Sequence, residues 1–254
     1  MTISVEVAIL SEPGGRMVNE DACGYWRSGN HFCAVLADGA GGHAGGEVAS
    51  RLAIKSLLDG FSKAPPSSGL ELAGLVHQTN QAVLDARSES VDLAQMHTTI
   101  VSLSIDLSDG QTHWVHCGDS RLYWFQNKQL VERTQDHSLV QSLVNAGLLE
   151  EQEIRTHPQR NVLQFALGLD DSELDLALSP ISKTIQGTNV FLLCSDGVWE
   201  YVNDATLEIL LASAATPSDW LASIQRAVLE ATSSKTTHDN YSAMAIWLEG
   251  ESQA

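Results

Sequence analysis

The sequence lacks any apolar run of the roughly 18 to 20 residues that a helix needs to cross a bilayer. It also lacks the basic start and long apolar segment of a secretory signal, and its first residues are expected to form a strand. Basic residues are scarce, since 14 Lys and Arg stand against 32 Asp and Glu, for a formal charge of −18. A chain this acidic repels nucleic acid and anionic membranes. We therefore expect neither a nucleic-acid partner nor insertion into a membrane.

Cysteine is sparse as well, and its spacing argues against two kinds of site. The four cysteines, Cys23, Cys33, Cys117 and Cys194, form no CxxC pair, and three of them lie in apolar, strand-like runs. Buried free thiols in a reducing cytoplasm are the expected state. The nine histidines are scattered and contain no HExxH pattern, which disfavours a zinc site.

The apolar content of 43% in 254 residues is enough for a sizeable core. Hydrophobic periodicity predicts strands at residues 2–10, 22–28, 31–37, 98–106, 111–117, 120–126, 129–132, 173–178, 188–194 and 241–248. It predicts helices at residues 44–62, 70–88, 137–147, 150–155, 204–213 and 217–232. This order is not the regular alternation of a parallel doubly wound sheet. It predicts an α+β fold with two antiparallel sheets and outer helices, in a single domain over residues 1–254.

Three apolar runs end in an aspartate beside a glycine. FCAVLAD ends at Asp38, HWVHCGD at Asp119 and VFLLCSD at Asp196, while Asp239 directly precedes the last apolar strand. Ionised carboxylates at the mouth of a core are costly unless their charge is compensated. Several of them converging on one place would repel each other, shift their pKa values or capture a cation.

An Asp-Gly pair often forms nothing more than a turn. Asp109-Gly110 joins two strands in a polar setting and is interpreted in that way. For Asp38-Gly39 or Asp196-Gly197 alone, a turn and a ligand role are equally open. Carboxylate ligands without a Cys or His cluster indicate hard ions such as Mg²⁺, Mn²⁺ or Ca²⁺, and no EF-hand pattern is present. A carboxylate shared between two ions is a usual way to build a two-metal hydrolytic centre.

Eight short motifs then follow one another along nearly the whole chain. They are RMVNED at 16–21, LADGAGGHAGGEVAS at 36–50, Thr98-Thr99, CGDSR at 117–121, TQDHS at 134–138, HPQRNVLQFALG at 157–168, CSDGVWE at 194–200 and HDN at 238–240. In this order they resemble the type 2C, metal-dependent Ser/Thr protein phosphatase family in its compact bacterial form. The resemblance implies a four-layer α-β-β-α sandwich that hydrolyses phosphoserine and phosphothreonine with a metal-activated water. It also implies two core Mn²⁺ or Mg²⁺ ions in the cleft at one end of the sheets, with a third, weaker ion.

The resemblance further implies roles for individual acidic residues. Asp38 matches the carboxylate that bridges two ions, and the Gly39 carbonyl is expected to contact one of them. Asp196 and Asp239 match the remaining direct ligands of the other ion. Three more positions complete the set: Glu20 and Asp21 match residues that hold metal-bound waters, and Asp119 matches the partner of the third ion, with Asp196 shared.

Arg16 matches the arginine that grips the substrate phosphate, and its planar guanidinium suits that contact better than a lysine. The alternative is a surface arginine beside a Gly-Gly turn. The departing oxygen also needs a proton. Many eukaryotic relatives have a histidine directly after the Asp-Gly pair, but this chain has Ala40. His43 is a candidate acid, and a water on the third ion or a purely loop-anchoring His43 remain open alternatives. No phosphoenzyme is expected, because no Cx₅R or other nucleophile motif is present.

The segment at about 139–180 matches, in position, a variable flap beside the cleft in relatives. It carries Arg155, His157 and Arg160 and is expected to guide substrates, although an exposed loop is the alternative. The implied partners are phosphorylated proteins, with a cognate Ser/Thr kinase and its substrates, and a cytoplasmic monomer is expected. The alternative function is a catalytically inactive module that binds phosphoproteins. The presence of Asp38, Asp196 and Asp239 disfavours that alternative.

Overall fold

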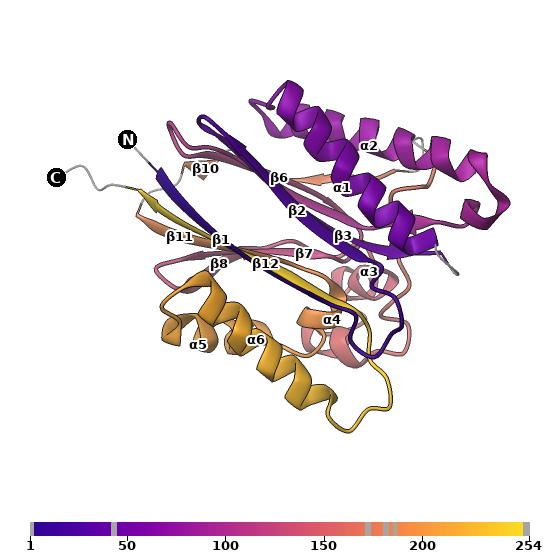
Figure 1. Cartoon of the computed structure of the whole chain (residues 1–254). Coiled ribbons are helices and arrows are strands. Elements are labelled where there is room, and N and C mark those ends of the chain that lie inside the picture. Colours follow the sequence, from indigo (N-terminus) through magenta and orange to yellow (C-terminus); the bar gives the residue numbers. More distant parts are fainter. Residues whose placement is uncertain (1–2, 42–44, 171–173, 180–182, 185–186, 251–254) are drawn as a thin grey trace.

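The computed structural model of the chain describes residues 3–41, 45–170, 174–179, 183–184 and 187–250. Two antiparallel sheets lie against each other in the middle of the molecule, and helices cover their outer faces (Figure 1). The predicted α+β fold with two central antiparallel sheets and flanking helices is therefore confirmed. None of the helices in the described part of the chain is long and apolar enough to span a bilayer.

The first sheet has the strand order β1-β12-β11-β7-β8. Its strands are β1 (Ile3–Glu12), β12 (Tyr241–Gly250), β11 (Thr188–Cys194), β7 (Arg121–Gln126) and β8 (Gln129–Arg133). The second sheet has the order β10-β6-β5-β3-β2, with β4 paired to β3 and β9 paired to β6. Its strands are β2 (Asp21–Ser28), β3 (His31–Ala40), β4 (His97–Thr98), β5 (Ile100–Asp106), β6 (Gln111–Cys117), β9 (Ala177–Leu178) and β10 (Lys183–Thr184).

Two helix pairs form the outer layers (Figure 1). The helices α1 (Gly45–Lys63) and α2 (Gly69–Glu89) cover the second sheet, and α5 (Asp204–Ser213) and α6 (Pro217–Thr232) cover the first. Shorter elements are α3 (Leu139–Asn145), α4 (Asp196–Trp199) and the 3₁₀ helices η1 (Val91–Leu93) and η2 (Glu151–Thr156). Local sequence sets the helix starts: Thr216 caps α6 by accepting a hydrogen bond from the Asp219 N–H, and Pro217 occupies the first turn.

Strand β3 shows why its sequence is an unbroken apolar run. Ala34 and Leu36 pack in the core between the two sheets, whereas Cys33, Val35 and Ala37 pack in the core beneath α1 and α2. Because successive side chains of a strand point to opposite faces, a strand covered on both faces must be apolar throughout. Asp38 is the first residue at which this double cover ends.

The predicted strand at residues 173–178 is wrong in extent. β9 comprises Ala177–Leu178, and residue 173 lies outside the described residues. Leu174 and Leu176 pack against the core under α2 without joining a ladder. An alternation of apolar residues indicates which side chains are buried, but it does not indicate whether the backbone pairs with a neighbouring strand. The short elements β10, η1 and α4 were not predicted. The strand predicted at 98–106 is divided into β4 and β5, and the helix predicted at 150–155 is the 3₁₀ helix η2.

His116 of β6 stacks on His137, which lies between β8 and α3, and this pair predicts that acid lowers the stability of the fold. The His116 and His137 rings are 4.8 Å apart, and His116 Nε2 donates to the Gln135 carbonyl at 2.7 Å. Burial, and then the charge of His137, lower the pKa of His116 to about 4. The unfolded chain therefore binds the proton more tightly, so this contribution to stability is complete above about pH 6.5 and is lost as the pH falls toward 4.

Between pH 7 and pH 4.5 the free energy of unfolding should fall by about 2–3 kcal/mol more in the wild type than in His116→Gln. Urea unfolding at several pH values measures this difference. His77→Gln, which changes an exposed histidine of α2, is the control and should keep the wild-type slope. Parallel slopes for the wild type and His116→Gln would contradict the prediction.

Candidate metal centre

The ends of five strands bring acidic residues to one end of the two sheets. Asp21 opens β2 and is paired in register with Asp38 near the end of β3. Asp119 lies two residues after the end of β6, Asp196 begins α4 two residues after the end of β11, and Asp239 lies two residues before the start of β12. Because neighbouring antiparallel strands start and end at common edges, residues far apart in the sequence meet here.

A cavity of about 230 Å³ lies at this edge. Among the predicted site residues, it is lined by Arg16, Glu20, Asp38, Gly39, Asp119, Asp196 and Asp239. Asp21 is buried beside it with 6% of its surface exposed. His43, a candidate acid, lies outside the described residues. Seven residues to which the sequence assigned no role at the site also line the cavity: Ala40, Gly41, His97, Thr99, Asn161, Leu163 and Asn240.

The electrostatics of the cavity centre on Asp38. Burial raises the pKa of the Asp38 carboxyl well above its ordinary value, and the charges of Asp21, Asp196, Asp119 and Asp239 raise it further. Burial and then the charge of Asp119 likewise raise the pKa of Asp196 well above its ordinary value. Carboxylates this close stay charged together when a cation offsets their repulsion.

One carboxylate oxygen of Asp21 is unpaired. Asp21 Oδ2 accepts a hydrogen bond of 2.8 Å from the Ser195 hydroxyl, whereas Oδ1 is buried without a hydrogen-bond partner. Burial raises the pKa of Asp21 to about 6 against the lowering effect of that hydroxyl. A buried acceptor without a partner is costly. The position suits a carboxylate that holds a metal-bound water, as predicted for Asp21.

Two glycines allow the backbone to close around the cavity. A Cβ on Gly39 would lie 2.0 Å from the Gly46 carbonyl oxygen, and a Cβ on Gly197 would lie 2.0 Å from the Asn240 carbonyl oxygen. A side chain at Gly39 would push the Asp38 segment away from the start of α1, and a side chain at Gly197 would push α4 away from the residue that precedes β12. The glycines of these Asp-Gly pairs therefore serve close packing at the site as well as the turn.

The donor set fits a hard divalent cation, because it consists of carboxylate and backbone oxygens. Within the described ranges, no three His, Cys, Asp or Glu side chains already surround one point as a closed metal cluster. The carboxylates instead border a cavity that leaves room for water, and ions of the Mg²⁺ type keep several waters when they bind. The residues present thus fit a partly hydrated ion better than a fully protein-ligated one.

Arg16 lies at the rim of the cavity. Its Nη2 donates to Asp239 Oδ2 at 2.9 Å, with 55% of the Arg16 side chain and 40% of the Asp239 side chain exposed. An ion pair this exposed is worth at most about 1 kcal/mol, so a dianionic ligand in the cavity can compete for the guanidinium. The geometry is compatible with the predicted phosphate contact.

Hydroxyl and amide side chains fix the backbone of the acidic residues. Thr99 Oγ1 accepts from the Asp38 N–H at 2.9 Å and shares a hydrogen bond of 2.7 Å with the Ser120 hydroxyl. Asn240 Oδ1 accepts from the Glu20 N–H at 2.9 Å, and its Nδ2 donates to the Pro13 carbonyl at 2.9 Å. The TT and HDN motifs marked these positions, but their roles required the strand pairing.

A buried arginine, Arg121, is linked through Trp199 to the acidic residues of the cavity. Arg121 Nε and Nη2 donate to the two oxygens of Asp136 at 2.8 and 2.7 Å, and the guanidinium lies 3.7 Å from the centre of the Trp199 ring. Trp199 Nε1 in turn donates to the Asp119 carbonyl at 2.9 Å. This chain of contacts joins Asp119 to α4, the helix that begins with Asp196.

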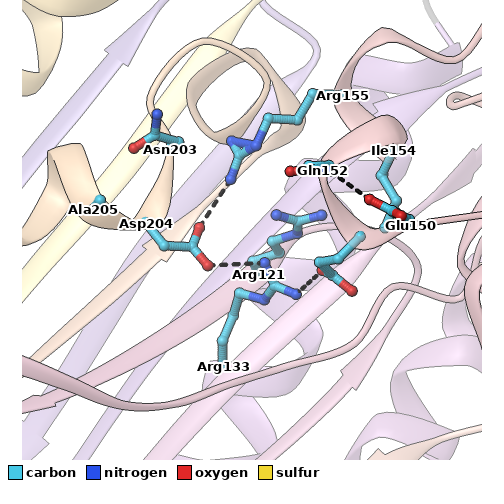
Figure 2. Close-up of a pocket in the computed structure, with 10 residues that line it drawn as sticks. Arg121, Arg133, Glu150, Gln152, Ile154, Arg155, Asn203, Asp204 and Ala205 are labelled. Atoms are coloured by element: carbon cyan, nitrogen blue, oxygen red, sulfur yellow. Dashed lines mark hydrogen bonds and ion pairs between the residues drawn. The ribbon is translucent and has the colours of Figure 1, made fainter.

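A second cavity, of about 480 Å³, lies beside Arg121 (Figure 2). Arg133 and Arg155 both contact the carboxylate of Asp204 there, at 3.1 and 2.9 Å. Arg155 also donates to the Trp199 carbonyl, and Arg160 pairs with Glu200 just after α4. These two arginines of the predicted flap therefore fasten the segment to α4, and neither lines the metal cavity.

Comparison with known proteins agrees with this geometry. The family model of protein phosphatase 2C matches residues 14–228. The serine/threonine phosphatase stp of Listeria welshimeri is 36% identical over 203 residues, covering 77% of this chain and 78% of that protein. The structure of Stp1 from Staphylococcus aureus has a TM-score of 0.84 at 29% identity, covering 98% of this chain and 96% of that one.

A further similar structure is the catalytic domain of the phosphatase PstP in complex with two manganese ions. It has a TM-score of 0.81 at 27% identity and covers 98% of this chain and 100% of that one. The chain belongs to the protein phosphatase 2C family. The family and the enzyme class predicted from the eight motifs are thereby confirmed.

Proposed function

We propose that this protein removes phosphate from phosphoserine and phosphothreonine in proteins and requires Mn²⁺ or Mg²⁺ for the reaction. The observation that carries the proposal is the convergence of four further carboxylates on Asp38, in a cavity whose rim holds Arg16. Its relatives in Listeria welshimeri and Staphylococcus aureus, which are Ser/Thr phosphatases, and the two manganese ions in the PstP domain support it.

The acidic residues would hold the ions in the way that the motifs imply. Asp38 would bridge two core ions, with the Gly39 carbonyl on one of them and Asp196 and Asp239 on the other. Glu20 and Asp21 would hold waters of these ions, and Asp119 would share a third, weaker ion with Asp196. Bound ions of this kind supply a nucleophilic water at neutral pH and offset the charge of the phosphate.

Arg16 would bind two phosphate oxygens through its planar guanidinium and orient the ester for in-line attack. Its exposed contact with Asp239 keeps it beside the carboxylates until substrate arrives. A lysine at this position would keep the charge but lose the paired N–H groups. Arg16→Lys should therefore raise KM for a phosphopeptide.

We further infer a single domain over residues 1–254, in which the segment at 139–180 acts as a flap. Asn161 and Leu163 of this segment line the cavity, while Arg155 and Arg160 fasten it to the neighbourhood of α4. The partners would be phosphorylated proteins, including the targets of a cognate Ser/Thr kinase. The protein would act as a monomer in the cytoplasm, and its four free cysteines fit a reducing compartment.

The test is hydrolysis of p-nitrophenyl phosphate and of a phosphothreonine peptide with Mn²⁺, with Mg²⁺ or with EDTA. Turnover that depends on the metal and stops with EDTA is the expected result. A well-folded, Mn²⁺-loaded protein that hydrolyses neither substrate would overturn the proposal and favour a phosphoprotein-binding module.

A further inference from the structure

The alcohol of serine or threonine is a poor leaving group, so its departure from phosphorus is helped by a proton donor. Of the histidines that the structure describes, His97 is the one that lines the metal cavity. We propose that His97 is the general acid that protonates the leaving oxygen. This inference rests on the proposed function, because it concerns the same cavity and the same ester.

Strand pairing places His97 at the position where the acid is needed. In the ladder between β3 and β4, Gly39 pairs with Thr98 and Ala40 pairs with His97. Directly opposite residues of an antiparallel pair point to the same face, with Cβ atoms about 4.5–5.5 Å apart. Asp38 and Ala40 share that face because side chains alternate along a strand. The imidazole therefore emerges beside the methyl group of Ala40, on the face that carries the Asp38 carboxylate.

The backbone that carries His97 is fixed relative to Asp38. The Thr99 N–H donates to the Asp38 carbonyl at 2.8 Å, and the Thr98 hydroxyl donates to the same carbonyl at 2.9 Å. On its other side, Thr98 exchanges backbone hydrogen bonds of 3.1 and 2.8 Å with Leu167. Because this short strand is hydrogen-bonded on both edges, the backbone of His97 is held in place relative to Asp38. A group that transfers a proton at one atom requires such positioning.

The imidazole is also oriented for donation. His97 Nδ1 lies 3.0 Å from the Gln95 carbonyl. Because a carbonyl can only accept, Nδ1 carries the hydrogen, and Nε2 is left as the nitrogen that can serve substrate. Nε2 has no hydrogen-bond partner among the described residues. The side chain is partly exposed, so a substrate in the cavity can reach it.

His97 protonates the leaving oxygen as the ester bond breaks. The oxygen of the attacking water gives an electron pair to phosphorus while the ester P–O bond breaks and its electrons pass to the serine or threonine oxygen. That oxygen takes the Nε2 proton of the His97 imidazolium and leaves as the alcohol. The proton lost by the attacking water returns to the neutral imidazole through solvent, so water and phosphoester become alcohol and inorganic phosphate.

The experiment compares two substrates that differ in their need for an acid. The leaving group of p-nitrophenyl phosphate is acidic and departs as an anion, whereas threonine needs the proton. With saturating Mn²⁺, His97→Asn should lower kcat for a phosphothreonine peptide by about 10²-fold, with KM and the p-nitrophenyl phosphate rate unchanged. For phenyl phosphate, the loss of kcat should lie between the losses for the other two substrates.

Controls separate this role from the alternatives. His77→Asn, on the exposed surface of α2, should match the wild type on both substrates, and His43→Asn should not show the substrate-selective loss. Added imidazole should restore part of the peptide activity of His97→Ala, which provides a readout independent of the Asn side chain. Equal losses on both substrates, or no loss on the peptide, would overturn the role of His97. A wild type inactive on both substrates would instead overturn the proposed function.

Discussion

Asp38→Asn is expected to lower Mn²⁺-dependent hydrolysis by about 10³-fold or more, the scale on which a principal electrostatic contributor to the transition state is lost. The same change should make the metal-free protein more stable. Four carboxylates act on Asp38 in addition to its burial, and all of them raise its pKa. The wild-type protein therefore loses stability as the pH rises above the ordinary value for aspartate, because the folded state holds a proton that the unfolded chain releases.

Asparagine does not ionise, so Asp38→Asn removes this loss of stability at higher pH. The melting temperature of the EDTA-treated variant should exceed that of the wild type at pH 7.5, by about 2–4 °C for each kcal/mol relieved. The difference should shrink toward zero as the pH falls to about 4, where the unfolded chain also begins to bind the proton. Calorimetry at the two pH values measures it. Asp109→Asn, in the polar turn between β5 and β6, is the matched control and should change neither activity nor this pH dependence. A destabilised, active Asp38→Asn enzyme would contradict the assignment of Asp38.

Breaking the buried ion pair behind the centre is expected to give the largest loss of stability. Arg121 and Asp136 have 2% and 1% of their side chains exposed and are joined by two hydrogen bonds. Removing one partner leaves a charge with no compensation in the interior. Asp136→Leu or Arg121→Met should each lower the free energy of unfolding by about 3–5 kcal/mol, or roughly 10 °C in melting temperature.

The double variant distinguishes a lost pair from lost packing. Arg121→Met combined with Asp136→Leu leaves no buried charge and should recover a large part of the loss, as a double-mutant cycle in urea would measure. The exposed pair of Lys55 and Asp59, with side chains 74% and 54% exposed, is the control. Its disruption by Lys55→Met should cost less than about 1 kcal/mol. Strictly additive losses at Arg121 and Asp136 would show that the two side chains stabilise the fold independently.

The element order of this fold could be predicted because strands such as β3, β11 and β12 are almost continuous apolar runs. The run before Asp38 is buried on both faces, and the final strand is buried between β1 and β11. Short elements could not be predicted in this way. β4 has two residues, one of which is His97, and it exists because Gly39 and Ala40 offer it a ladder partner. The sequence predicted a strand from residue 98 onward and did not mark His97.

Local sequence was sufficient to mark the acidic residues of the site, because an ionised aspartate at the end of a buried run is costly unless its charge is compensated. The eight motifs were sufficient for the family. Long-range pairing decides the rest: which carboxylates act on Asp38, that Arg16 meets Asp239, and that His97 stands beside Ala40. These neighbours lie on different strands, and their contact depends on the register of the sheets and the packing of one sheet on the other, which no local pattern of residues encodes.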